Sequence, residues 1–139
     1  MKIGPMGYLG DPDLHDGYLT GLELIEEHIL QIRLRNVVGK RFTMELSGLH
    51  LLLANEIRQG NIILNIRIEH RRDPDPSLMR QLIGGLHPSV GEPYRTKHED
   101  YFKRMADAVR NGDLTLVAVE ASYGCDLVAL CKSASIAEG

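Results

Sequence analysis

Acidic and imidazole side chains gather in one short segment near the start of the chain. Asp11, Asp13, His15 and Asp16 lie within the six residues 11–16. A histidine and a neighbouring aspartate can share a divalent ion that activates water, so His15 and Asp16 are candidate catalytic residues. The same segment is typical of a turn in which Asp side chains accept hydrogen bonds from nearby backbone. We favour the turn and predict no bound metal and no cofactor, because no two of the six histidines have ligand spacing.

Glu120 is the third candidate catalytic residue. By strand alternation it shares a face with Leu116 and Ala118, where a carboxylate is not expected. A buried carboxylate must be paired or carry a raised pKa, and such groups are enriched at functional sites. A functional Glu120 requires a histidine or an arginine opposite it. The alternative, which we favour, is a side chain near the end of a strand that reaches solvent or binds an arginine.

Four arginines lie on the polar sides of predicted strands: Arg33, Arg35, Arg41 and Arg67. If these strands are neighbours, one face is rich in guanidinium groups, which suits an acidic partner surface or a phosphate group. Acidic residues alternate onto the same faces, so cross-strand ion pairs are the simpler explanation. No aromatic residues interleave with the arginines to stack on bases, and we expect no nucleic-acid binding.

The composition is that of a single globular domain over residues 1–139. Hydrophobic residues make up 43% and charged residues 25%, with a net charge of −3, which excludes a disordered chain or a strongly basic protein. No apolar run approaches the ~18 residues of a membrane span. Cys125 and Cys131 lie roughly 20 Å apart if they share one strand, too far for a bridge. With no export signal, we expect a cytoplasmic protein with reduced thiols and no membrane contact.

Period-2 alternation of apolar and polar residues predicts that strands dominate the chain after an irregular segment over 1–21. Gly21 is predicted to be a weak point or a bulge in the first strand. Segment 49–57 is compatible with a strand or a helix, and we favour a strand because turn residues lie close to both ends. The predicted strands are 18–26, 28–35, 41–46, 49–57, 61–70, 114–122 and 126–136.

Two helices are predicted before the last two strands. Asp75-Pro76 has the chemistry of a helix start and Gly84-Gly85 that of a helix end. Thr96 and Glu99 have capping-box spacing, and Asn111-Gly112 ends the second helix.

The last two strands are predicted to form a hairpin that is apolar on both faces. A two-residue turn at Tyr123-Gly124 pairs Ala118 with Ala129. Burial on both faces places this hairpin centrally, with a helix or second sheet on each side. The predicted fold is α+β: a mainly antiparallel sheet of about six or seven strands, with two helices inserted before the C-terminal β-hairpin.

Scattered positions over about half of the chain resemble those of small bacterial β-rich proteins of unknown function. These positions are His15-Asp16-Gly17, Leu22, Gly48, Gly60-Asn61-Ile62-Ile63 and Ser122-Tyr123-Gly124-Cys125. Some bacterial proteins of comparable size and mild acidity are immunity proteins, which bind and neutralise a toxin domain. The resemblance implies an immunity-like binding protein and carries over no functional residue.

We therefore predict a bacterial protein–protein binding module, whose partner is another protein or a second copy of the chain. The sequence has no complete catalytic signature, which favours a binding protein over an enzyme. One alternative is a metal-dependent hydrolase that uses the 11–16 loop with Glu120. Another is a small-ligand binder with a pocket between sheet and helices. Its predicted lining is Met44, Met79, Met105 and Tyr101, although methionines at such spacings are more often core residues.

Overall fold

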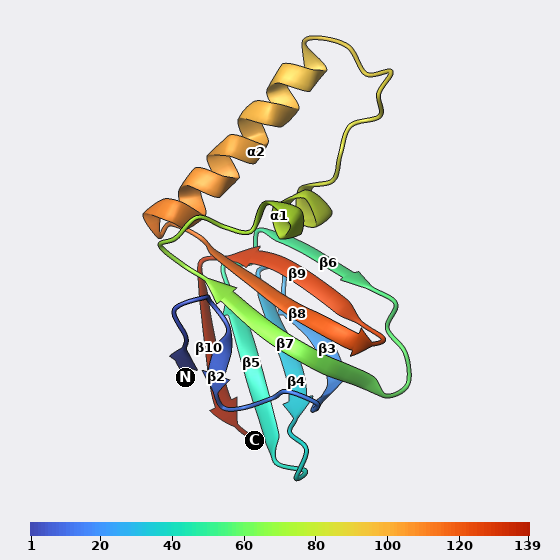
Figure 1. The fold of residues 1–139 in the computed structure, drawn as a ribbon, viewed down its shortest axis with the longest axis vertical. Coiled ribbons are helices and arrows are strands. Elements are labelled where there is room, and N and C mark those ends of the chain that lie inside the picture. The colour runs from blue at the N-terminus through green and yellow to red at the C-terminus, as the bar shows by residue number, and fades with distance from the viewer.

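The computed structural model describes all 139 residues, and antiparallel strands dominate it (Figure 1). One sheet has eight strands, a second has two, and two helices precede the last three strands. The α+β class is confirmed, with more strands than predicted. The elements are β1 (Lys2–Ile3), β2 (Leu9–Asp11), β3 (Tyr18–Glu26), β4 (Ile29–Arg35), β5 (Arg41–Ser47), β6 (Leu51–Asn55), β7 (Asn61–Glu69), α1 (Pro76–Ile83), α2 (Tyr94–Asn111), β8 (Thr115–Tyr123), β9 (Asp126–Cys131) and β10 (Ser133–Glu138).

The large sheet closes on itself through two bent strands. Its order is β10-β5-β4-β3-β7-β8-β9-β6, in which β5 continues into β6 and β9 continues into β10. The first bent strand pairs with the second along both halves, β5 with β10 and β6 with β9. The two ends of the strand order are therefore joined, and the closed sheet surrounds a core of apolar side chains.

The bend explains why the predicted strand 126–136 is two strands. At the bend, the Lys132 amide donates hydrogen bonds to the carbonyl oxygens of Ser47, at 2.9 Å, and Gly48, at 3.2 Å. Gly48 has a φ of 64°, and a Cβ there would lie 2.6 Å from the Lys132 side chain. Only glycine lets the two bent strands cross this closely.

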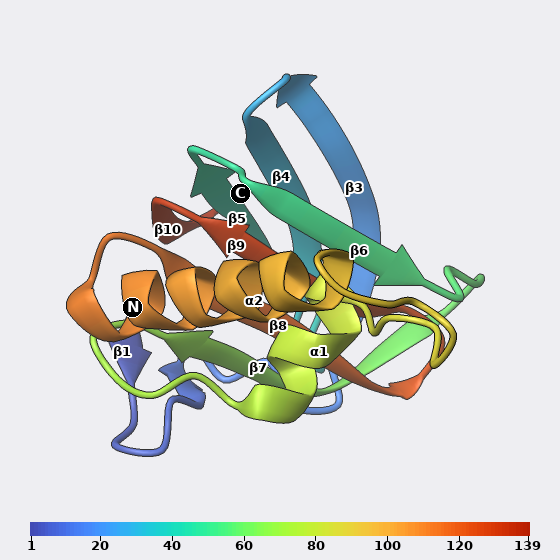
Figure 2. The same cartoon turned by 90° about the horizontal axis from the view of Figure 1, so that it is seen from above.

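Apolar residues form two cores, one on each side of the β8–β9 hairpin. Inside the closed sheet, 17 buried residues pack together, among them Val117 and Val119. On the outer side, Leu116 and Ala118 form a second core with Leu78 and Met79 of α1 and with Val109 near the C-terminal end of α2. Helix α1 lies against this side of the sheet, whereas most of α2 extends away from it (Figures 1 and 2). The predicted burial of this hairpin on both faces is confirmed.

The predicted register of this hairpin is wrong by one residue. Ala118 lies opposite Val128, not Ala129. Gly124, which has a φ of 87°, and Cys125 connect the two strands. Because a slip of one residue exchanges the two faces of a strand, Val128 packs outward under the helices and Ala129 packs inward.

The predicted helix signals are confirmed at three of four ends. Asp75 caps α1, which ends before Gly84, and Gly112 ends α2 in the left-handed conformation. The start of α2 differs, because the helix begins at Tyr94 and Thr96 lies inside its first turn. There the Thr96 hydroxyl donates to the Glu92 carboxylate, so no capping box forms.

The remaining strand predictions are largely confirmed. Residues 18–26 form a strand with a register shift beside Gly21, as predicted. The ambiguous segment 49–57 contains β6, so the strand interpretation is confirmed. The segment 1–21 differs from the prediction, because β1 and β2 form a small two-stranded sheet within it.

Candidate functional site

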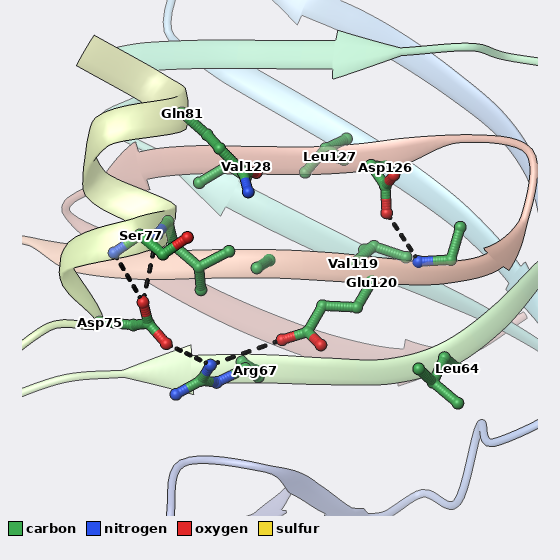
Figure 3. A pocket seen from close by; sticks show the side chains of 13 residues that line it. Leu64, Arg67, Asp75, Ser77, Gln81, Val119, Glu120, Asp126, Leu127 and Val128 are labelled. Carbon is green, nitrogen blue, oxygen red and sulfur yellow. Dashed lines mark hydrogen bonds and ion pairs between the residues drawn. The ribbon is translucent and has the colours of Figure 1, made fainter. Parts of the chain in front are cut away.

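The strongest candidate site is a charged pocket on the outer face of β7, β8 and β9, beside α1 (Figure 3). Its volume is about 330 Å³. Leu78, Ala118 and Val128 form an apolar wall. The polar side chains around it are Arg67, Asp75, Ser77, Gln81, Glu120 and Asp126.

Arg67 is the centre of this pocket and contacts three carboxylates. Its Nη1 lies 2.8 Å from Asp75 Oδ2 and 3.6 Å from Glu120 Oε1, and its Nη2 lies 3.2 Å from Glu69 Oε1. The Arg67 side chain is 16% exposed, and the ring of Tyr8 lies over its guanidinium group. The strand pattern of the sequence and the start of α1 together produce this cluster.

Strand register and a helix cap place the charged groups. Arg67 lies opposite Ala118, and Asn65 lies opposite Glu120, so Arg67 and Glu120 occupy neighbouring strands. Asp75 ends the loop after β7, and its Oδ1 accepts hydrogen bonds from the backbone amides of Ser77 and Leu78. One carboxylate therefore caps α1 and holds Arg67.

Burial and hydrogen bonding within the cluster shift the pKa values of Glu69 and Asp75. Burial raises the pKa of Glu69, which is 1% exposed, against the opposing effect of Arg67. Burial alone would also raise the pKa of Asp75, but the hydrogen bonds from Arg67 and from the α1 amides outweigh it and the pKa is lowered. At neutral pH, Asp75 is therefore a charged partner of Arg67.

Glu120 is the group in this cluster that the protein satisfies least. It lies on the face predicted from alternation, with Leu116 and Ala118, and its nearest arginine is Arg67, two residues further along the neighbouring strand from Asn65, which lies opposite Glu120. Its Oε1 is buried and accepts no hydrogen bond, because Arg67 is too far away at 3.6 Å. No protein donor reaches Oε2, which is left to solvent, and the side chain as a whole is 28% exposed.

His15 and Asp16 lie in the loop between β2 and β3 and do not line the pocket with Glu120. The His15 ring contacts the Leu64 carbonyl oxygen through Nδ1 at 2.6 Å, which raises the pKa of His15 together with the nearby Asp16 charge. The His15 amide donates to Asp13 Oδ1, as in the predicted turn. Nowhere in the chain do three His, Cys, Asp or Glu side chains come together as metal ligands would.

The structure divides the four predicted arginines into two places. Arg33 pairs with Glu23 at 2.6 Å, and Arg35 lies directly opposite Arg41, so these three share the β4–β5 region. Tyr18 of β3 lies opposite Arg35 of β4 on one side and opposite Ile62 of β7 on the other, so Ile62 gives the position of β7 relative to these arginines. Arg67 lies five residues further along β7, roughly 16 Å from Ile62, and therefore belongs to the pocket alone.

None of the four residues predicted to line a small-ligand pocket borders this one. Met44 and Met79 are completely buried core residues, while Met105 packs beside the outer core. A pocket between sheet and helix does exist, but other residues line it, with an apolar wall and charged side chains around it. Both cysteines are free and buried, and burial raises the pKa of the Cys131 thiol to about 12.

Sequence reasoning missed Asp75 and Asp126 as members of the site. Asp75 was assigned only the role of a helix cap, and its approach to Arg67 depends on the path of residues 70–74. Asp126 has a weak signal as the first residue of the predicted strand 126–136, close to the Tyr123-Gly124 turn. Strand alternation could have indicated that Arg67 and Glu69 share a face.

Comparisons with known proteins found no match, so the site is interpreted from its own geometry. Neither helix has the length and apolar character needed to cross a membrane. No protein-family model, no curated protein and no solved structure matches this chain.

Proposed function

We propose that this protein is a small-ligand binding module whose pocket beside α1 takes a small organic cation. The ligand class is an alkylammonium or guanidinium compound with a short aliphatic chain. The observation that carries the proposal is the unsatisfied Glu120 carboxylate at the edge of a pocket with an apolar wall.

The balance of charge decides the sign of the ligand. Arg67 is the one cationic residue that lines the pocket, against three acidic residues, Asp75, Glu120 and Asp126. The Nη atoms of Arg67 already contact carboxylates, and its Nε has no hydrogen-bond partner but is buried away from solvent. An anion would therefore meet repulsion from the carboxylates without an accessible charged donor, whereas a cation is attracted.

Two carboxylates are available to bind the cationic group. Glu120 has Oε2 open to solvent, and Asp126 uses Oδ1 to accept a hydrogen bond from the Ala121 amide. The two residues lie on neighbouring strands at the same end of the pocket (Figure 3). An ammonium or guanidinium group between them would make charge-assisted hydrogen bonds, which are about twice as strong as neutral ones.

The rest of the pocket suits an aliphatic chain. Leu78, Ala118 and Val128 provide apolar contact, and the volume of about 330 Å³ is at the lower end for small-ligand sites. A purely structural cluster needs only Glu69 and Asp75, which contact the two Nη atoms of Arg67. Glu120 adds a third carboxylate without a second cationic residue in the pocket, which supports a binding role.

Calorimetric titration with butylammonium and butylguanidinium tests the proposal, with butyrate and butanol as anionic and neutral controls. Both cations should bind and both controls should not. Glu120→Gln keeps the shape of the side chain and removes its charge, so it should weaken cation binding about tenfold.

Glu45→Gln is the matched control, because Glu45 is also a half-buried strand glutamate but accepts a hydrogen bond from Gln31 far from the pocket lining. It should leave cation binding unchanged. Equal binding of butyrate and butylammonium, equal binding to the Glu120→Gln variant, or no binding of either cation would contradict the proposal.

A further inference from the structure

We infer that the free edge of β3 docks an extended, basic segment of a partner protein. This inference is independent of the charged pocket and concerns a separate surface. It gives a specific structural form to the protein-binding function predicted from the sequence.

The pairing of β3 leaves most of one edge open. β3 pairs with β4 from Tyr18 to Glu26, but it pairs with β7 only at Tyr18 and Leu19. Beyond these two residues, the β3–β4 hairpin projects away from β7, as Figure 2 shows. The edge of residues 20–26 therefore presents backbone N–H and C=O groups that no strand of this chain uses.

This edge is regular and apolar enough to receive a strand. Residues Gly21–Leu24 pair with β4 without a register shift, between one irregularity at Leu19/Gly21 and another at Leu24/Glu26. Leu24 is 58% exposed and Ile25 is 45% exposed. Proteins usually protect a free edge with charged side chains, proline, bulges or a covering segment. This edge has glutamates and an irregularity at each end, but no lysine, no proline and no covering strand over Gly21–Leu24, and an extended peptide binds such an edge by adding a strand.

The charges along the edge define the partner. Glu23 and Glu26 lie in its distal half and Glu27 lies in the adjoining β3–β4 turn, and only Glu23 has an arginine partner, Arg33. Glu26 has no ion pair, and Glu27 contacts only the neighbouring His28. A segment with Lys or Arg beside aliphatic residues complements this edge, whereas a second copy of the same edge would bring glutamates together.

A random peptide library displayed on phage, selected against the full chain, is the probe. Peptides that alternate aliphatic and basic residues should be enriched. Leu24→Lys should weaken their binding at least about tenfold, because lysine adds like charge and removes apolar contact.

Val38→Lys is the matched control, since Val38 is an 83% exposed valine in the β4–β5 turn, away from the edge. It should bind the selected peptides like the wild type, and circular dichroism should show both variants folded. Peptides that bind Leu24→Lys equally well, selected sequences without basic residues, or a dimer of the chain that excludes the peptides would overturn the inference.

Discussion

Asp75 links local helix chemistry to the charged pocket at the scale of single residues. Its Oδ1 accepts from the Ser77 and Leu78 amides, and its Oδ2 accepts from Arg67. Asp75→Ala removes the cap and the ion pair together. We expect it to lower the free energy of unfolding by about 1–2 kcal/mol, measured by urea denaturation.

Asp75→Asn separates the two roles, because asparagine caps helices nearly as well as aspartate but carries no charge. It should cost less than Asp75→Ala at neutral pH. A loss as large as that of Asp75→Ala would show that the charge on Asp75, and not the cap, dominates.

The difference in stability between the wild type and Asp75→Asn should depend on pH, because the pKa of Asp75 is lowered in the folded protein. Burial opposes that shift, while hydrogen bonds from Arg67 and the α1 amides cause it. The ionised carboxylate therefore stabilises the fold above the ordinary value of 3.8, and this contribution is lost as the pH falls through the lower folded-state pKa. The stability gap between wild type and Asp75→Asn should shrink in that range, and a gap independent of pH would contradict this account.

Asn61 and Gly124 connect several elements at the next scale. The Asn61 side chain is buried, and its Oδ1 accepts from the amides of Arg58 and Cys125. It thereby joins the β6–β7 turn, the start of β7 and the β8–β9 turn. Gly124 allows this contact, because a Cβ there would lie 2.4 Å from Asn61 Oδ1.

Gly124→Ala should lower the free energy of unfolding by more than about 2 kcal/mol, because it combines a left-handed φ with this clash. Gly60→Ala is the matched control: its φ of 81° is similar, but no atom lies within 4 Å of its Cβ position. It should cost about 1 kcal/mol from backbone strain alone. Equal losses in thermal or urea unfolding would contradict the role assigned to Asn61.

These elements show how far local sequence signals extend. The bounds of β3 and the cap of α1 were predictable, because alternation and capping act within a few residues. The hairpin register was not, because the Tyr123-Gly124 signal does not determine which residues of the two strands lie opposite one another, and Val128 joins the outer core with α1 only in the observed register. The start of α2 differed because Thr96 interacts with Glu92 within the first turn.

At the scale of the whole molecule, the closed sheet sets where each surface lies. The pairing of the bent strands β5–β6 and β9–β10 closes the sheet, and α1 covers part of its outer face to form the pocket. Glu120 and the arginines were identifiable as candidates from alternation, but their neighbours depend on pairings between distant strands. This is why the sequence indicated Glu120 without its partner, and Arg67 without its separation from Arg33, Arg35 and Arg41.

The most direct measurement of the central claim is the location of bound butylguanidinium by NMR. We predict intermolecular nuclear Overhauser effects from its methylene protons to the methyl groups of Ala118 and Val128, with amide shifts at Asp126. These signals should weaken in Glu120→Gln. Contacts confined to another surface, such as the exposed charged side chains Lys97, Asp100, Lys103, Arg104 and Asp107 of α2, would contradict the assignment of the pocket as the cation site.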